Sequence, residues 1–315
     1  MKWNYTKGLK DLGNGAYAYL QPDGGWGWSN AGLIVDGEES LLVDTLFDET
    51  LTREMLGHMK DATGLGGGDI TTLANTHANG DHTYGNRLIE NAEIIASEAS
   101  AREMEEVTPE YMAHMVKSGK DMGPAGAYLA KSFAAFDFKN VGYTMPTKTF
   151  SGEMTVKVGD KTAHLIEVGP CHTHGDVLVH VPDDKVIYTG DILFIEGTPI
   201  MWEGPISNWL KALDMIMDMD LDAIVPGHGP ITDKAGVKVL RDYFTWIDRE
   251  ARLRYDAGMS WDDAARDMAG GKYSSWLDAE RIAINVATLY REYAETSERA
   301  PMMELWGLMA ELSNR

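Results

Sequence analysis

Short apolar runs alternate with glycine-rich or acidic turns over the first 75 residues of the chain. Such runs, bounded by turns, are typical of β-strands. They predict strands over residues 16–20, 31–35, 40–43 and 70–75. Before the last of these, Leu51, Met55 and Met59 recur at helical spacing, which predicts a helix over residues 47–60.

Residues 97–138 show a different pattern, because the segment is helix-like and rich in methionine. Glycine or proline interrupts it at Gly119 and at Gly123–Pro124. We interpret the segment as an insertion of two or three helices, at about residues 97–140. Beyond it the pattern predicts a helix over residues 209–219 and strands over residues 155–158, 162–167, 176–181, 186–189 and 223–225.

From about residue 232 onward only helical patterns remain, over residues 237–256, 261–268, 276–295 and 302–313. Periodicity alone therefore predicts an α+β protein with two or more layers. Both halves of residues 1–231 repeat the order strands, helix, strand, which suggests a four-layer αββα sandwich. We expect one domain over residues 1–231, carrying the helical insertion, and a helical C-terminal extension over residues 232–315.

Composition narrows the class of partner. The chain has 315 residues, of which 44% are hydrophobic, as in globular proteins, and its formal net charge is -21. A surface with this much negative charge repels phosphate backbones and anionic membranes. We therefore expect a small-molecule partner and neither nucleic acid nor membrane. The single cysteine, Cys171, excludes an intramolecular disulfide. With no apolar run near the N-terminus and none of the roughly 20 residues that span a bilayer, a cytoplasmic location is the expectation.

The candidate chemistry begins directly after the strand predicted at residues 70–75. Residues 76–82 read Thr-His-Ala-Asn-Gly-Asp-His and place four candidate metal ligands within six positions. His77 and Asn79 are two residues apart, so in an extended loop their side chains point the same way. Asp81 and His82 are adjacent and point in different directions, which allows them to serve a second ion.

Three further candidates follow later strands. His172 comes after a Gly-Pro turn, Asp191 follows the strand at residues 186–189 through one glycine, and His228 lies in a Pro-Gly-His-Gly-Pro loop. Each candidate lies just past the end of a predicted strand, where loops are free to carry polar groups. We therefore expect all of these side chains to converge on one point.

In this order the motifs resemble those of the metallo-β-lactamase-fold superfamily, which carries His-x-His-x-Asp-His, a later histidine, Thr-Gly-Asp and Gly-His. The resemblance covers residues 15–230 and implies the αββα sandwich and a dinuclear metal site. By position it assigns one metal ion to His77, Asn79 and His172 and the other to Asp81, His82 and His228, with Asp191 bridging the two.

Asn79 is the main departure, because the family usually has histidine there. An amide oxygen is a harder and weaker ligand for zinc than an imidazole. Four outcomes stay open: weak metal binding at the first position, a preference for iron or manganese, replacement by His174, or an Asn79 that hydrogen-bonds water or substrate instead. Cys171 is interpreted as a small buried residue and Asp44 as a structural hydrogen-bonding residue.

The resemblance implies a hydrolase with two divalent ions, zinc with iron or manganese as alternatives. Such ions share a hydroxide at neutral pH, and this hydroxide attacks the substrate. Asp81 is expected to orient the hydroxide. The sequence has neither a Gly-x-Ser-x-Gly elbow nor a phosphate-binding Gly-Lys-Ser/Thr loop. Metal-based redox or lyase chemistry on the same scaffold is the alternative. A binding protein with a degenerate site comes third, supported only by Asn79.

Substrate recognition is predicted from aromatic and apolar segments. Trp26 and Trp28 lie in a glycine-rich loop that overhangs the site in the resembling family, although core packing explains them equally well. His174 fits a position near the substrate or at the surface. Together with the methionine-rich insertion, these residues predict a hydrophobic ester, lactone or thioester. The C-terminal extension either covers the sandwich or forms a homodimer through a stripe containing Ile282, Val286 and Leu289.

Overall fold

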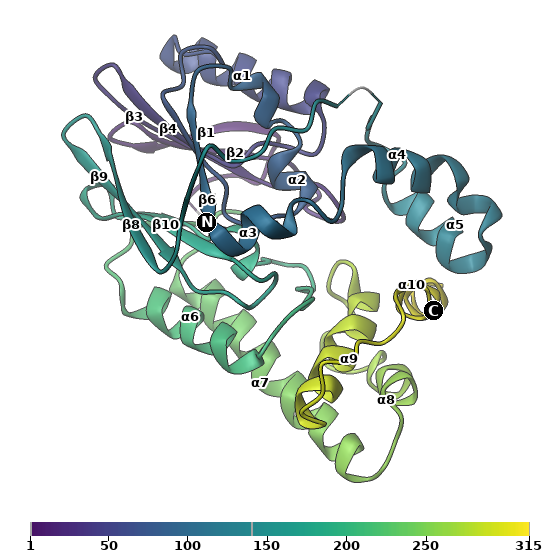
Figure 1. Ribbon diagram of the computed structural model, residues 1–315. Coiled ribbons are helices and arrows are strands. Elements are labelled where there is room, and N and C mark those ends of the chain that lie inside the picture. Colours follow the sequence, from purple (N-terminus) through teal and green to yellow (C-terminus); the bar gives the residue numbers. More distant parts are fainter. Residues whose placement is uncertain (1, 140, 315) are drawn as a thin grey trace.

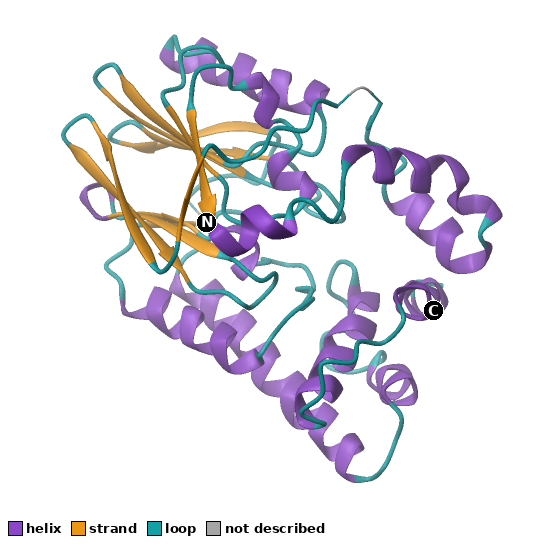
Figure 2. Ribbon diagram, viewed as in Figure 1, coloured by secondary structure: helices purple, strands orange, loops and turns teal. Residues whose placement is uncertain are grey.

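The fold is a four-layer αββα sandwich, in agreement with the prediction. The computed structural model describes residues 2–139 and 141–314. Two β-sheets face each other, and helices cover the outer face of each (Figures 1 and 2). All nine predicted strands are present. Strands β1, β6 and β7 were not predicted, because they are polar, short or adjoin the helical insertion.

In the described part of the chain the first sheet has seven strands, which follow one another in space in sequence order. Strands β1 to β4 pair antiparallel, and β4 to β7 pair parallel. The strands are β1 (Gly8–Gly13), β2 (Ala16–Leu20), β3 (Ala31–Asp36), β4 (Glu39–Val43), β5 (Thr72–Ala74), β6 (Glu93–Ser97) and β7 (Lys148–Phe150).

The second sheet has five described strands in the order β12-β11-β10-β9-β8. Its members pair antiparallel except for β12, which lies parallel to β11. The strands are β8 (Glu153–Val158), β9 (Lys161–Glu167), β10 (Val177–Val181), β11 (Val186–Tyr188) and β12 (Ala223–Val225).

The two sheets pack face to face through an apolar core. Gly32 of β3 lies directly against the ring of Tyr188 in β11, so closely that a Cβ atom on Gly32 would stand 2.2 Å from the ring. The Tyr188 hydroxyl donates a hydrogen bond to the carbonyl of Tyr17 across the same interface. A glycine is needed here because the tyrosine occupies the space of a side chain.

Each outer face is covered by helices with an apolar stripe. Helix α1 (Glu49–Thr63) buries Met55 and Met59 against the first sheet; Asp48 caps its N-terminus and Gly64, with φ 83°, ends it. Helices α6 (Ile206–Asp218) and α7 (Lys234–Asp256) cover the second sheet. Their central contact is between the rings of Trp209 and Phe244, 4.5 Å apart.

The helical insertion and the C-terminal helices meet beside the sandwich (Figure 1). Helices α5 and α10 pack together, and Phe133 after α5 contacts Trp306 of α10. The insertion contains α3 (Glu98–Glu103), α4 (Pro109–Ser118) and α5 (Gly123–Ser132). The C-terminal part adds α8 (Trp261–Met268), α9 (Ile282–Tyr293) and α10 (Met302–Leu312) to α7.

The stripe proposed for dimerisation is buried inside the chain. Ile282, Val286 and Leu289 of α9 are 5%, 0% and 0% exposed, so they are not available to a second copy. Their apolar spacing reflects packing against α7 and α8. Over the described residues, no helix is both long and apolar enough to cross a membrane.

Candidate metal centre

One tight helical turn presents the ligands of the first half of the sandwich. After β5 ends at Ala74, the chain enters α2 (Gly80–Thr83), which places Asp81 and His82 side by side. The Asn75 side chain fixes this turn by donating to the carbonyl of His82 at 3.1 Å. His77 lies on the strand side of the turn, so all three ligand candidates face the same edge of the sheet.

The second half contributes three side chains from three loops. His172 follows β9 and precedes β10, in a loop closed by Asp176, whose carboxylate accepts backbone hydrogen bonds from Cys171 and Thr173. Cys171 is fully buried, as expected, and burial raises the pKa of its thiol. Asp191 lies in the short turn η4 (Gly190–Ile192), directly after β11.

His228 follows β12 in a loop that passes very close to Asp191. A Cβ atom on Gly227 would stand 2.0 Å from Asp191 Oδ1, so only glycine allows this approach. The backbone N–H of Gly227 also donates to the carbonyl of Gly190 at 2.8 Å. The loop that carries His228 is thereby held against the turn that carries Asp191.

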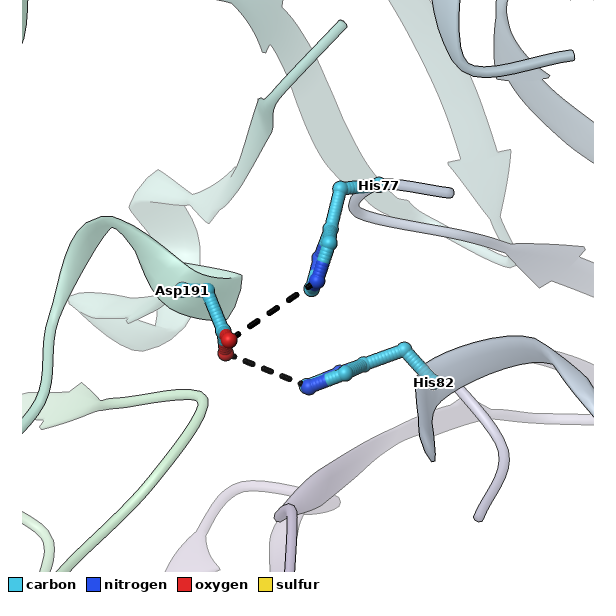
Figure 3. A group of neighbouring side chains, drawn as sticks. All are labelled: His77, His82 and Asp191. Carbon is cyan, nitrogen blue, oxygen red and sulfur yellow. Dashed lines mark ion pairs between the residues drawn. The ribbon is translucent and has the colours of Figure 1, made fainter. Parts of the chain in front are cut away.

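Asp191 lies at the centre of the cluster, surrounded by imidazoles from both halves of the molecule. Figure 3 shows His77 and His82 pointing toward its carboxylate. Its oxygens lie 3.8 Å, 3.2 Å, 3.3 Å and 3.4 Å from Nε2 of His77, His82, His172 and His228, respectively. Asp81 Oδ2 lies 3.3 Å from Nε2 of His228 and 3.9 Å from Nε2 of His82.

Each imidazole is oriented by a hydrogen bond at Nδ1. His172 and His228 donate to the carbonyl oxygens of Ile200 (2.6 Å) and Gly24 (3.1 Å), and His82 bonds Asp44 Oδ2 (2.9 Å). His77 Nδ1 lies 3.0 Å from the hydroxyl of Thr76, which itself donates to Asp44. In each histidine Nδ1 is therefore bonded to another protein group, and all four Nε2 atoms face one another, as in histidine metal sites.

Several of these inward-facing atoms have no hydrogen-bond partner in the described part of the chain: Nε2 of His77, His82 and His172, and Oδ1 of Asp191. Buried polar atoms are nearly always paired, so four unpaired atoms facing one point call for a ligand. Imidazole nitrogens and carboxylate oxygens are donors for zinc and other divalent transition metals. The residues present therefore fit a metal centre.

Electrostatics divides the cluster into neutral and charged groups. Burial lowers the pKa of His77 well below its usual value, helped by neighbouring His82, and burial also lowers the pKa of His172. Burial would raise the pKa of Asp191, but the surrounding imidazoles hold it well below its usual range. These groups are therefore in the metal-binding protonation state near neutral pH.

His82 and His228 behave differently because carboxylates surround them. Burial opposes their protonation, but Asp191, with Asp44 and Asp81, raises the pKa of His82 well above its usual value. Against the same burial, Asp191 and Asp81 raise the pKa of His228 to about 9. In the metal-free protein both imidazoles hold a proton at neutral pH, which a metal ion would displace.

Asn79 and His174 occupy different places. Asn79 lines the cavity above the cluster, and its side chain makes no hydrogen bond to any residue that the structure describes. His174 is half exposed and lies 3.4 Å from both Glu103 and Glu203, in a separate group at the rim. The structure thus leaves the Asn79 amide free and does not bring His174 to the imidazoles.

A cavity of about 270 Å³ opens over the cluster. Its floor contains Asp81, His172, Asp191 and His228. Its walls are mostly apolar and come from the glycine-rich loop, the loop before α1, the helical insertion, the segment between η4 and α6, and the C-terminal helices. They include Trp26, Phe47, Met112, Leu129, Phe133, Phe194, Trp202 and Trp306. The lining also contains charged residues, namely Glu103, Glu106, Glu203, Arg281 and Arg299.

The two tryptophans of the glycine-rich loop have different surroundings. Trp26 lines the cavity and packs between Phe133 and Trp306. Trp28 packs on Phe136, with ring centroids 4.8 Å apart, and is not among the lining residues. Sequence reasoning missed Arg281 and Trp306 as cavity residues. Each lies in a helix-like stretch beyond residue 231, and no local pattern marks either one.

The fold is an αββα sandwich, and its strand-end loops bring histidines and aspartates together. This combination of fold and site is that of a class of metal-binding proteins. The chain belongs to the metallo-beta-lactamase superfamily, whose profile matches residues 24–228. This match confirms the resemblance inferred from the motifs.

Named relatives in this superfamily are similar over part of their length. A beta-lactamase-like protein 2 homolog of Caenorhabditis elegans is 25% identical over 211 residues, 67% of this chain and 59% of that protein. A hydroxyacylglutathione hydrolase of Brucella anthropi is 30% identical over 171 residues, 50% of this chain and 66% of that protein. The chain thus spans about three-fifths to two-thirds of the curated relatives it matches.

A solved structure shows the same fold over nearly the whole chain. The sec-alkylsulfatase Pisa1 from a Pseudomonas species superposes with a TM-score of 0.70 at 16% identity. The similarity covers 94% of this chain and 52% of that one. At this identity the likeness establishes the fold alone.

Proposed function

We propose that this protein is a metal-dependent hydrolase that acts on an ester, lactone, thioester or related bond of an apolar small molecule. The observation that carries the proposal is the convergence of four imidazole Nε2 atoms on Asp191, at 3.2 to 3.8 Å, on the floor of an apolar cavity. Membership of the superfamily and a hydroxyacylglutathione hydrolase among the relatives support it.

The proposed site holds two divalent ions, zinc being the first choice and iron or manganese the alternatives. His77, Asn79 and His172 would hold one ion and Asp81, His82 and His228 the other, with Asp191 between them. When bound, such ions would supply an acidified water and polarise the bond to be broken. Asn79 offers a weaker oxygen donor, so the first position is the more weakly occupied of the two.

Asp81 is proposed as the residue that orients the attacking water. Its side chain is 13% exposed, against 4% for Asp191, so Asp81 is the carboxylate that reaches farther into the cavity. Burial would raise the pKa of Asp81, but His82 and His228 lower it, so the carboxylate is charged and can accept a proton from water.

The remaining parts of the chain shape the cavity. We propose residues 1–231 as the domain that carries the metal centre, with the insertion at about 97–140 and the extension 232–315 as the walls for the substrate. Leu129 and Phe133, at the end of the insertion, face the cavity together with Trp306 of the extension. Their apolar rings exclude water and favour a hydrophobic substrate.

Metal analysis of protein purified without chelator provides the first test. We expect up to two transition-metal equivalents per chain, and loss of activity with most of the metal in His77→Ala and His228→Ala. His164→Ala is the matched control, because His164 lies in β9 outside the cluster and should leave both quantities unchanged. Protein free of transition metal, or active without it, would refute the proposal.

A panel of chromogenic esters, lactones, thioesters, β-lactams and sulfate esters then identifies the bond. Turnover of one class of substrate that disappears on chelation and returns on adding zinc would support a hydrolase. The class that is turned over identifies the bond that is hydrolysed. Redox-active iron, with turnover that requires oxygen or a thiol, would instead establish the redox alternative.

A further inference from the structure

Arg281 is a buried cation in the wall of the cavity. It belongs to the turn η5 (Ala279–Arg281), just before α9, and is only 2% exposed. It lines the same cavity as Asp191 and His228. A buried arginine is costly unless its charge and its donors are matched, so the surroundings of this side chain reveal what it is built for.

Two aromatic rings flank the guanidinium. Its Cζ atom lies 4.2 Å from the ring centroid of Trp26 and 5.5 Å from that of Phe194. Phe194 in turn stacks parallel on the ring of His228, with centroids 5.0 Å apart and an interplanar angle of 1°. Phe194 therefore contacts both the Arg281 cation and a predicted metal ligand, and the aromatic faces hold the guanidinium in place.

The edges of the guanidinium are only partly used. One terminal nitrogen donates to the carbonyl of Thr198 at 2.9 Å, and the other lies 2.8 Å from Asp278 Oδ2. Nε is buried and has no hydrogen-bond acceptor among residues 2–139 and 141–314. A guanidinium offers five N–H donors in a rigid plane, and the contacts to Thr198 and Asp278 do not use them all, so donors remain on a side chain that lines the cavity. An oxyanion is the group that best matches it.

The other cavity cation also pairs with a carboxylate, as Arg281 does with Asp278, but it differs in burial. The Arg299 side chain is 50% exposed, and its guanidinium is already bound to Glu203 Oε1 at 2.5 Å. Glu203 also faces Arg291 and His174. Charges at this rim are therefore paired among themselves, whereas Arg281 keeps a buried donor, Nε, without an acceptor among the described residues.

We propose that Arg281 binds an oxyanion of the substrate, so that the substrates are apolar molecules carrying a carboxylate or sulfo group near the bond that is hydrolysed. The inference rests on the proposed function, because it treats the cavity as the substrate site. The anionic group lies at Arg281, the apolar body packs on Trp26, Phe133 and Trp306, and the reacting bond lies over Asp81 and Asp191.

Binding of non-hydrolysable probes tests this inference without requiring turnover. Decanoate, decane-1-sulfonate and decan-1-ol share an apolar chain and differ in the head group. Calorimetric titration of the as-purified protein should show tighter binding of at least one of the two anions than of the alcohol. The anion that gains affinity identifies the head group as carboxylate or sulfo.

Variants separate Arg281 from direct binding of the anion to metal. Arg281→Gln should lower the affinity for the anion roughly tenfold to a hundredfold, as expected for loss of a charge-assisted hydrogen bond. It should leave the affinity for decan-1-ol unchanged. Arg281→Lys should lose less than Arg281→Gln, because it keeps the charge, and it remains informative if Arg281→Gln does not fold. Arg299→Gln is the matched control and should change the affinity for either probe by less than about twofold.

Equal weakening of anion and alcohol, or anion binding that ignores Arg281, would overturn the inference, provided that metal content and unfolding temperature match the parent protein. In that case the proposed hydrolase function would still stand, with a neutral ester as the substrate. Conversely, Arg281-dependent anion binding in a protein that hydrolyses nothing would support the inference while refuting the proposed function.

Discussion

Asp44 Oδ2 lies 2.9 Å from His82 Nδ1 and also accepts the Thr76 hydroxyl at 2.7 Å. One carboxylate oxygen thus orients His82 directly and His77 through Thr76, whose hydroxyl lies 3.0 Å from His77 Nδ1. The backbone of Asp44 has φ 63°, a left-handed conformation that places the carboxylate under both imidazoles.

Asp44→Asn should lower metal affinity about tenfold to a hundredfold, a range typical for the loss of such an orienting group. Asparagine tolerates the left-handed backbone, but with its amide oxygen in the place of Oδ2 its NH2 group would face the backbone N–H of Thr76, which donates to Asp44 Oδ1 at 2.7 Å. Competition with a chelating dye measures the affinity, and circular dichroism controls for folding. Unchanged affinity would show that His82 does not need Asp44.

Metal binding at pH 7 should release protons from the metal-free protein. His82 and His228 hold them because nearby carboxylates raise their pKa values against the effect of burial, to about 9 for His228. The apparent metal affinity should therefore rise with pH up to about 9. Titration calorimetry in two buffers of different ionisation enthalpy counts the protons, and equal heats in both would contradict the assignment.

The same raised pKa predicts how the stability of the metal-free protein changes with pH. Because the folded-state pKa of His228 exceeds the ordinary value of 6.5, its contribution is fully present below pH 6.5 and is lost as pH rises through about 9. Urea unfolding at pH 6 and pH 10 checks the sign. The metal-loaded protein is the control and should lack this contribution.

Asn79→His should strengthen metal binding at the first position. Asn79 lines the cavity without a hydrogen bond to any described side chain, so an imidazole there displaces no existing contact. We expect this variant to retain more metal than the parent after dialysis against a weak chelator. Asn79→Ala is the control, and equal retention in all three proteins would exclude residue 79 as a ligand position.

His174→Ala should leave the metal content unchanged. The His174 ring lies between Glu103 and Glu203 at the rim and is not grouped with the buried imidazoles. His172→Ala, two residues earlier, is the contrasting variant and should lose metal. If His174→Ala loses as much metal as His172→Ala, then His174 does replace the histidine absent at position 79.

Gly32→Ala should destabilise the sandwich by about 1–3 kcal/mol, because the new methyl group would overlap the Tyr188 ring between the sheets. Gly57→Ala in α1 is the matched control, since a Cβ there meets no atom within 4 Å. It should instead be neutral or stabilise by roughly 0.5–1 kcal/mol through the higher helix propensity of alanine. Chemical denaturation of both variants measures the difference.

The convergence of the ligand candidates was predictable because these residues follow strands with strong apolar patterns. The strand predictions near residues 70–75, 186–189 and 223–225 placed His77, Asp191 and His228 at strand ends, and parallel pairing of β11 with β12 brings the last two together. Because the end of each strand determines where these side chains lie, their approximate position could be predicted without knowing the packing of the helices.

The cavity walls were not predictable in the same way. Periodicity over residues 276–295 suggested one continuous helix, but Asp278, with φ 53°, turns the chain before α9 begins at Ile282. Arg281 reaches the cavity because of that turn. Its approach to Trp26 joins residues 255 positions apart, a contact set by packing of the C-terminal helices that no local pattern encodes.

His77, Asp81 and His82 come from the first half of the sandwich, and His172, Asp191 and His228 from the second. Neither half alone supplies more than three of these donors, so a nascent or clipped chain cannot assemble the full ligand set. Loading with metal would therefore serve as a checkpoint on folding: only a molecule with both sheets docked acquires the reactive centre.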